Sequence, residues 1–484
     1  MKKIFLPIII FIILASVLVS FTLAGCKNTT TTTAAAETTV AGAETTAAGA
    51  ETAKPNVSEP VTITLWHMDW TPFTEGFANV VSGFKEKNPN ITVQLEPQPG
   101  QTELVTKMRS ALVSGKGASM FATPGTTILE WAIAGNLQPV TPGVFTVDWA
   151  KENLLPENLS HCNLNDQLWA VGIPDGPGDW AVIANTDHLK EAGLPVIDKF
   201  ESMAQLLEYA KKLSKYDASG KLVRAGLSFQ ESNDPIYFLS YVVDNGGKFW
   251  DNDNQKFTLN TPEAKEVLQF FYDIFYKEKF DSVELPDSAT GLLQGLDSMA
   301  FMWSEFKPYA EGATPGLNLT TILKPAFKGT QSPKFSHTDT WDVVVPKYVT
   351  GLEKDATFEF LRYLISEEGQ MKFLEKYPAI SPLKKLTLEN DFYTTGPGAY
   401  NKPMIDAIKA GGSLSHWGPY ASLDVIVYNI IWPNLDALIH QQISVDECLV
   451  KMDKELNEQI EKDKQKYPDM PKTIIEWNGL SAIK

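Results

Sequence analysis

The feature that most constrains the fold of this chain is an alternation of strand-like and helix-like segments that begins at Val61. Residues 61–66 alternate apolar and polar side chains at period two, as a half-buried strand does. Thr71-Pro72 predicts a helix N-cap followed by proline at the first helical position. A second strand at 91–95 and a second helix at 104–112 follow. This βαβα order predicts a parallel sheet covered by helices.

The same alternation continues far along the chain, which gives too many residues for one core. Strand-like runs recur at 168–173, 181–184, 299–303 and 341–345, and an amphipathic helix is expected at 445–460. Single hydrophobic cores stop growing at roughly 250–300 residues. We therefore expect an α/β protein of two lobes, each with a mostly parallel sheet flanked by helices.

The N-terminus has the pattern of a secretory signal. Met1-Lys2-Lys3 is basic, residues 4–23 are apolar, and Leu23-Ala24-Gly25-Cys26 ends the segment. The last four residues resemble the bacterial lipobox, and this resemblance implies a lipoprotein signal peptide at 1–25 and lipidation at Cys26. An uncleaved membrane helix is the alternative interpretation. No comparable apolar run follows, which argues against a protein with several membrane spans.

Residues 26–60 are predicted to be a disordered tether between this anchor and the folded body. The stretch from Lys27 to Lys54 consists almost entirely of Thr, Ala, Gly and Glu. Such a segment buries too little apolar surface to offset the entropy lost on ordering. We expect the tether to carry no chemistry of its own.

The composition excludes some partners and leaves the cysteines open to two interpretations. The net charge of −17 and the pI near 4.9 argue against a nucleic-acid partner, which requires a basic surface. Three cysteines, Cys26, Cys162 and Cys448, are too few for a disulfide scaffold. In an oxidising compartment Cys162 and Cys448 could pair. Their long separation in sequence favours two separate buried thiols.

Several segments of the chain together form a recognisable pattern: Ile63–His67, Phe84–Val93, Lys107–Gly117, Trp131–Val140, Asn165–Pro174, Ala184–Leu194 and Ala356–Gln370. In this order they resemble the extracellular solute-binding proteins of bacterial ABC importers, in the family that binds maltose and other oligosaccharides. Two departures stand beside them. Ala118-Ser119-Met120 replaces the usual Pro-Asp-apolar sequence, and Thr340-Trp341-Asp342 replaces paired glycines. The identity of a sugar therefore does not carry over to this chain.

The resemblance implies a two-lobed periplasmic-binding-protein-like fold, hinged by crossing strands, that closes on its ligand and docks on an ABC transporter permease. Crossings are expected near 173–178, 334–340 and 378–382. Lobe 1 would comprise 61–173 and 341–378, and lobe 2 would comprise 174–340 and 379–484. The ligand shifts the open–closed equilibrium through its higher affinity for the closed state. No cofactor is implied, and we expect a monomer.

Candidate ligand-binding residues follow from the rule that ligands bind beyond the carboxyl ends of strands in open α/β sheets. Tryptophan plates can cover the apolar face of a sugar, and carboxylates can bond its hydroxyls. The candidates are Trp66, His67, Asp69, Trp70, Thr123, Asp175, Trp250, Trp303, Glu305, Trp341 and Trp417. Core packing of each tryptophan, and a solvated surface role for each carboxylate, are the alternatives. His67 and Asp69 lack a third residue at metal-ligand spacing, so no metal site is expected.

Two other classes of protein stay open. A lipid-anchored glycosidase would need two carboxylates flanking the scissile bond, and the chain has enough acidic residues to supply them. It has no Gly-x-Ser-x-Gly, His-Glu-x-x-His or P-loop motif. A lipoprotein that senses a ligand or adheres, with no transporter, is the third class. A peptide, a polyol phosphate or a metal chelate stays possible as the ligand.

Overall fold

The computed structural model describes residues 57–155, 158–159, 162–175, 181–230, 234–251, 253–329, 340–410 and 421–468. The predicted signal peptide, the lipidation site at Cys26, almost all of the tether, and Trp417 lie outside these ranges. Residues Thr52–Lys484 form one compact unit by their contacts. Within the described part of the chain, no helix is both long enough and apolar enough to span a bilayer.

The first sheet has the order β2-β1-β3-β15-β4, with β7 also paired to β15. Its strands are β1 (Val61–Met68), β2 (Ile91–Gln98), β3 (Met120–Pro124), β4 (Leu137–Gln138), β7 (Val171–Gly172) and β15 (Trp341–Pro346). Strands β2, β1 and β3 run parallel, which confirms the prediction for the opening of the chain. Strand β15 arrives from a distant part of the sequence and runs antiparallel to β3, β4 and β7.

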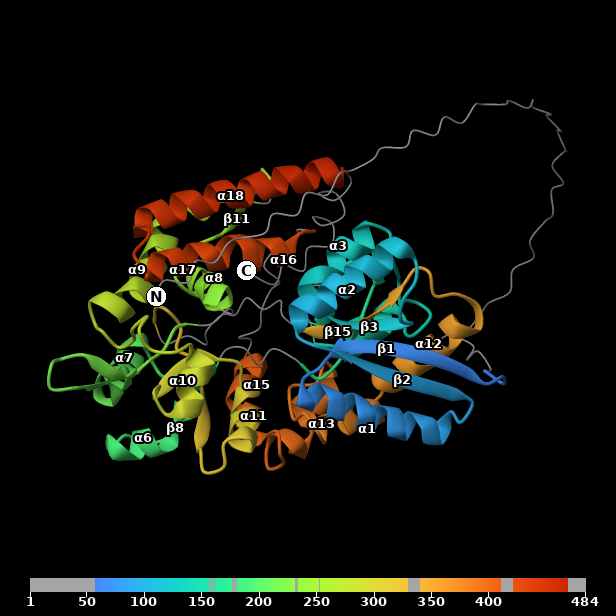
Figure 1. Cartoon of the computed structure of the whole chain (residues 1–484), viewed down its shortest axis with the longest axis horizontal. Coiled ribbons are helices and arrows are strands. Elements are labelled where there is room, and N and C mark those ends of the chain that lie inside the picture. Colours follow the sequence, from blue (N-terminus) through green and yellow to red (C-terminus); the bar gives the residue numbers. More distant parts are fainter. Residues whose placement is uncertain are drawn as a thin grey trace, which may run out of the picture. The chain divides into compact units, whose positions relative to one another are not determined.

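Helices cover both faces of this sheet. α1 (Thr71–Lys87) packs with α12 (Gly351–Leu364) and α13 (Glu367–Leu374), while α2 (Gln101–Ser114) lies on the other side of β1 and β2 (Figure 1). α1 forms because its apolar residues recur at helical spacing and are buried. Its start differs by one residue from the prediction, since Thr71 is already helical and Trp70 stands at the N-cap.

The second sheet has the order β13-β8-β14. Its strands are β8 (Ala181–Asn185), β13 (Met299–Met302) and β14 (Leu319–Leu323). The prediction of a mostly parallel sheet is wrong here, because β8 pairs antiparallel with both neighbours. Helix α11 (Phe306–Ala313) links β13 to β14, and these two strands point the same way as a βαβ unit requires. β8 enters between them from the first sheet in the opposite direction.

Both faces of the second sheet are buried. Val182 and Ala184 face a large core, whereas Ala181 and Ile183 face a smaller one, as the two-residue period of a strand requires. The helices around the large core are α7 (Met203–Leu213), α8 (Asp234–Asp244), α9 (Pro262–Tyr276), α17 (Trp432–Ile439) and α18 (Val445–Lys466). Helices α11 and α15 (Lys402–Lys409) contribute to the smaller core.

Three passages of the chain between the two sheets are predicted, and the third, at 378–382, lies wholly within the described residues. Most of the first two predicted crossings, 173–178 and 334–340, falls outside the described residues. At the third, the Tyr400 hydroxyl and the Asn401 amide donate to the Pro378 carbonyl over 2.8 and 3.0 Å. The Tyr393 hydroxyl donates to the Ala379 carbonyl over 2.8 Å. The segment is therefore fixed to the smaller core, while the proposed lobe boundaries stay a prediction.

The two cysteines within the described ranges are both unpaired and buried. Cys162 lies in the core of the first sheet, and Cys448 lies in the large core of the second. The prediction of separate thiols is confirmed.

Candidate functional site

A group of aromatic rings lies where the carboxyl end of β1 meets the helix that follows β13. Trp70 stands two residues after β1, and its ring centroid is 5.0 Å from Phe73, 5.2 Å from Tyr377 and 5.8 Å from Tyr309. Tyr309 belongs to α11, which follows β13. Elements of both sheets therefore meet at one place. We call this group the aromatic junction; its members are Trp70, Phe73, Trp303, Phe306, Tyr309, Trp341 and Tyr377.

The rings of the junction pack mainly edge to face, which is a favourable aromatic geometry. Trp341 stands 5.2 Å from Phe73, and Trp303 stands 5.4 Å from Phe306. Trp341 is only 6% exposed, so it packs in the core beneath the junction. Tyr309 is 38% exposed, and Trp70 and Trp303 are half-buried. These last three rings are the ones that can offer a face to a ligand.

Asp175 connects the junction to the strand that enters it. One carboxylate oxygen accepts a hydrogen bond from the Tyr377 hydroxyl at 2.9 Å, and the other accepts from the Trp341 backbone N–H at 3.1 Å. Burial and the nearby Asp175 charge raise the pKa of Tyr377 well above its usual value, so this phenol stays protonated and donates. Asp175 therefore orients two aromatic residues from separate segments.

Glu305 is a buried carboxyl group between Trp303 and Phe306 in the sequence. Burial raises its pKa to about 7, against hydrogen bonds from Ser304 and from the backbone at Ile380 that lower it. Its Oε1 has no hydrogen-bond partner among the described residues. The charge of Glu305 contributes to raising the pKa of Tyr377 and that of Tyr400. The group can therefore accept or donate a hydrogen bond near neutral pH.

Two predicted residues on β1 pack in the first core. The Trp66 ring stacks on Phe121 at 5.3 Å, and its Nε1 donates to Glu96 over 2.7 Å. His67 is fully buried beside Phe77, and its Nδ1 lies 2.8 Å from the Met68 carbonyl, which fixes the ring proton on Nδ1. Burial lowers the pKa of His67. In this conformation both side chains have packing roles.

Of three further predicted residues, one is next to a junction residue in the sequence, and the other two lie apart from the rings of the junction. Asp69 is exposed next to Trp70. Thr123 is buried and shares a hydrogen bond of 2.8 Å with the Thr127 hydroxyl. Trp250 lies in a hairpin of β11 (Trp250–Asp251) and β12 (Lys256–Phe257), where it packs on Phe257 at 5.3 Å. The structure thus brings Trp70, Asp175, Trp303, Glu305 and Trp341 to one region.

Sequence reasoning missed Tyr309 and Tyr377. Phe306 and Tyr309 stand three residues apart shortly after Trp303, and this spacing, which places two side chains on one helix face, was a usable signal for Tyr309. Tyr377 carries no such signal, because its role depends on Asp175, which is distant in the sequence.

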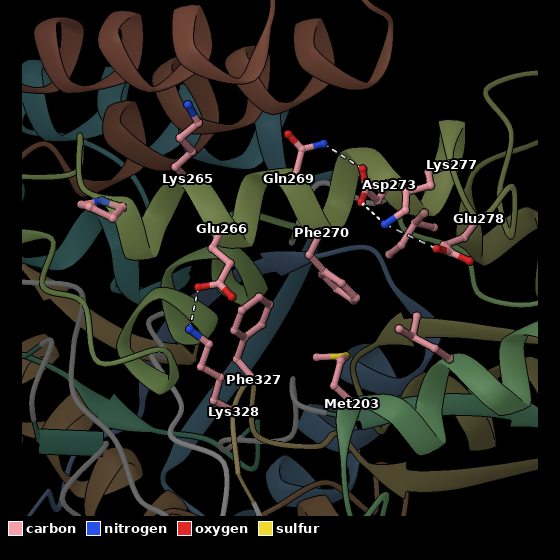
Figure 2. A pocket seen from close by; sticks show the side chains of 13 residues that line it. Met203, Lys265, Glu266, Gln269, Phe270, Asp273, Lys277, Glu278, Phe327 and Lys328 are labelled. Atoms are coloured by element: carbon pink, nitrogen blue, oxygen red, sulfur yellow. Dashed lines mark hydrogen bonds and ion pairs between the residues drawn. The ribbon is translucent and has the colours of Figure 1, made fainter.

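A separate groove lies between α7 and α9 and has a volume of about 610 Å³ (Figure 2). Phe270 and Phe327 form an aromatic wall with centroids 5.6 Å apart. Ion pairs occupy its rim, including Lys328 with Glu266 at 2.6 Å. All lining residues fall between Met203 and Lys328, so no element of the first sheet contributes. Movement of one sheet against the other would leave this groove unchanged, and it is a poor candidate for ligand capture by closure.

Metal-ligating side chains are not grouped at the junction. Across the described ranges, no three His, Cys, Asp or Glu residues are close enough together to hold a metal ion. The chemistry at the junction is that of aromatic faces and hydrogen-bonding carboxyl groups.

Solved structures with the same fold include several proteins bound to small molecules. Maltose-bound MalE3 of T. maritima matches with a TM-score of 0.66 at 18% identity, over 82% of this chain and 99% of that one. The maltotriose-bound MalE domain of Bdellovibrio bacteriovorus matches at 0.63 and 18%, over 83% and 100%. UgpB of Mycobacterium tuberculosis, in complex with glycerophosphocholine, matches at 0.65 and 15%, over 84% and 99%.

At these identities the structural likeness shows a shared fold. A comparison with curated proteins found no match. The family model for bacterial extracellular solute-binding proteins matches residues 70–371, which is more than half of the sequence. The matched span begins at Trp70 and includes Asp175, Trp303, Tyr309 and Trp341. The chain belongs to the family of bacterial extracellular solute-binding proteins.

Proposed function

We propose that this protein captures a carbohydrate at the aromatic junction and delivers it to the permease of an ABC importer. The observation that carries the proposal is the contact of Trp70 with Tyr309, which joins the carboxyl end of β1 to the helix after β13. Ligands of open α/β sheets bind beyond the carboxyl ends of strands. Two relatives of the same fold were solved with maltose and maltotriose.

In this proposal Trp70, Trp303 and Tyr309 cover the apolar C–H faces of the sugar. Asp175 and Glu305 supply hydrogen bonds to hydroxyl groups, and carboxylates make the stronger bonds of this kind. Tyr377 supports Trp70 through an edge contact, and Trp341 supports Phe73, which itself packs edge-on against Trp70. The remaining predicted residues, Trp66, His67, Asp69, Thr123, Trp250 and Trp417, are assigned no contact.

Closure of two lobes about the crossing segments would bring these residues around the ligand. UgpB, which shares the fold, was solved with glycerophosphocholine, so the same fold also holds a ligand of another class. Membership of an extracellular family supports an extracytoplasmic location. We propose that the lipid on Cys26 holds the protein at the membrane, that it acts as a monomer, and that it releases its ligand unchanged.

The test is thermal unfolding of residues Thr52–Lys484 with a panel that includes maltose, maltotriose and tagatose. A ligand that binds only the folded state adds about 2.7 kcal/mol at a hundredfold excess over Kd. For a protein of this size the Tm should rise by a few degrees. The sugar should be recovered chemically intact, because a glycosidase would consume it.

Two tryptophan variants locate the site. Trp303→Ala should abolish the sugar-induced rise in Tm, whereas Trp169→Ala should keep it. Trp169 is also half-buried, and its Nε1 donates to the Leu164 carbonyl in the first core. No rise with any sugar would overturn the carbohydrate assignment, and an equal loss in both variants would overturn the site.

A further inference from the structure

A second contact between elements of the two sheets is made by charged residues. Arg109 on α2 reaches Asp424 on α16 (Leu423–Val425), with the guanidinium 3.2 Å from the carboxylate. The same guanidinium lies 3.5 Å from Glu130 on α3 (Ile128–Ile133). Lys466, at the end of α18, adds an ion pair with Glu130 at 3.2 Å. Arg109 therefore stands between one carboxylate from each side.

The position of this contact places it at the ligand-binding edge of the first sheet. Helix α16 packs against η1 (Gly125–Thr127), which directly follows the carboxyl end of β3. Trp70 stands two residues beyond the carboxyl end of β1, which runs parallel to β3. The two contacts thus belong to the same edge of the sheet. Separation of the lobes at that edge would break both.

The surroundings of Asp424 hold it in place. The Ser422 backbone N–H and hydroxyl both donate to Asp463 on α18, and Gln459 donates to the Ser422 hydroxyl over 3.0 Å. Ala421 is fully buried and packs with Ile133 of α3 and Tyr467. The ion pairs are therefore flanked by an apolar contact and by hydrogen bonds to the last turns of α18.

Without Arg109, Asp424 would face Glu130 across this contact, with Lys466 still paired to Glu130. The side chains of Glu130 and Asp424 are each 21% exposed, so water screens them only partly. Burial raises the pKa of Asp424, Glu130 raises it further, and Arg109 lowers it. Removal of the arginine would take from Asp424 the cation that neutralises it, beside Glu130 and in a poorly solvated place, which costs more than the loss of an exposed pair.

We propose that Arg109 is an electrostatic latch that permits the lobes to close by neutralising Glu130 and Asp424. The proposal rests on the hinge closure proposed above. It assigns to Arg109 control of the open-to-closed ratio, and hence of apparent ligand affinity, through residues that need not touch the ligand.

The test is a distance measurement between spin labels in ligand-free protein comprising Thr52–Lys484. Glu86→Cys on α1 and Val450→Cys on α18 place labels at exposed positions on the two sides. Cys162 and Cys448 are buried and should resist labelling. Arg109→Glu should increase the population of long distances about fivefold or more relative to the unmodified protein. Arg109→Gln should give a smaller change in the same direction.

The charge swap and a matched control make the test specific. Arg109→Glu combined with Asp424→Arg should restore the original distances, because an arginine again lies between two carboxylates. Lys212→Glu, which breaks an exposed pair with Glu208 within one helix, should change nothing. Circular dichroism checks that each variant is folded.

Unchanged distances in Arg109→Glu, or failure of the swap to restore them, would overturn the latch. If Arg109→Glu does not fold, unchanged distances in Arg109→Gln overturn it instead. No ligand is present in this experiment, so its outcome is independent of whether the protein binds sugars.

Discussion

The ring of Trp70 and the ring of Tyr309 lie 5.8 Å apart, although one follows the first strand of the first sheet and the other lies in the helix after β13. Neither ring is fully buried. A ligand bound between these two rings would therefore contact elements of both sheets, and its binding would depend on how the two sheets are placed.

Tyr309→Ala should weaken ligand binding by roughly tenfold, because an aromatic face is lost from the junction. The Tm of the ligand-free protein should change little, since Tyr309 is 38% exposed. Tyr216→Ala is the matched control, with a tyrosine that is 44% exposed on β9 (Lys215–Tyr216). Titration calorimetry with the sugar identified by thermal shift compares the two, and equal affinities in the two variants would remove Tyr309 from the site.

Tyr377→Phe should destabilise the protein by about 1–3 kcal/mol, because the half-buried Asp175 carboxylate loses the hydrogen bond donated by the buried Tyr377 hydroxyl. The matched change Tyr272→Phe removes a hydroxyl that accepts from Gln441 at an exposed position, and it should cost less than about 0.5 kcal/mol. Urea unfolding monitored by tryptophan fluorescence measures both. Similar losses in the two variants would contradict the orienting role of Asp175.

Asp297→Asn should stabilise the protein at neutral and alkaline pH. Asp297 is fully buried, and its pKa is raised to about 9 by burial and by the charge of Asp281, whose own pKa burial raises to about 7. The folded state therefore holds a proton that the unfolded chain releases above about pH 4. The stabilising contribution is complete below that pH and is lost as the pH rises through about 9.

The corresponding measurement is Tm against pH from 5 to 9 for the two proteins. The Tm of the unmodified protein should fall more steeply than that of Asp297→Asn, because asparagine does not ionise. Asp253→Asn, at an exposed position, serves as the control and should follow the unmodified protein. Parallel curves for all three would show that Asp297 is ionised in the folded state.

Gly369→Ala should lower the Tm by roughly 3–10 °C. A Cβ at this position would lie 2.0 Å from the Tyr363 carbonyl oxygen, so backbone must move. Gly312→Ala is the control within another helix, where a Cβ would meet nothing within 4 Å, and it should leave the Tm unchanged or raise it. Calorimetry on both variants is sufficient. An unchanged Tm for Gly369→Ala would refute the close approach of α13 to Tyr363.

Local patterns in the sequence carried the prediction of the first sheet. β1, α1, β2 and α2 appear where the two-residue and helical periods place them. The direction of β8 was not predictable in this way, because it depends on which strands a βαβ unit brings together around it. Period and burial are the same for a parallel and an antiparallel strand that is covered on both faces.

The candidate site was likewise predictable only in part. The rule about carboxyl ends of strands selected Trp70 and Asp175, which the structure brings to the junction. The same rule selected His67, which lies one residue inside the end of β1 and faces Phe77. One position decides whether a side chain at a strand end points into a core or beyond the sheet, and sequence alone locates a strand end less closely than that.

The register of the second sheet has a mechanical consequence. β8 begins at Ala181, and this residue pairs with Met302 on one side and with Leu323 on the other. Met302 is the residue before Trp303. The strand that enters from the first sheet is therefore joined by backbone hydrogen bonds to the base of the indole plate. Any twist of β8 therefore turns Trp303 with it. A substitution that stiffens the passage between the sheets would also change the angle at which the Trp303 indole meets the ring of a bound sugar.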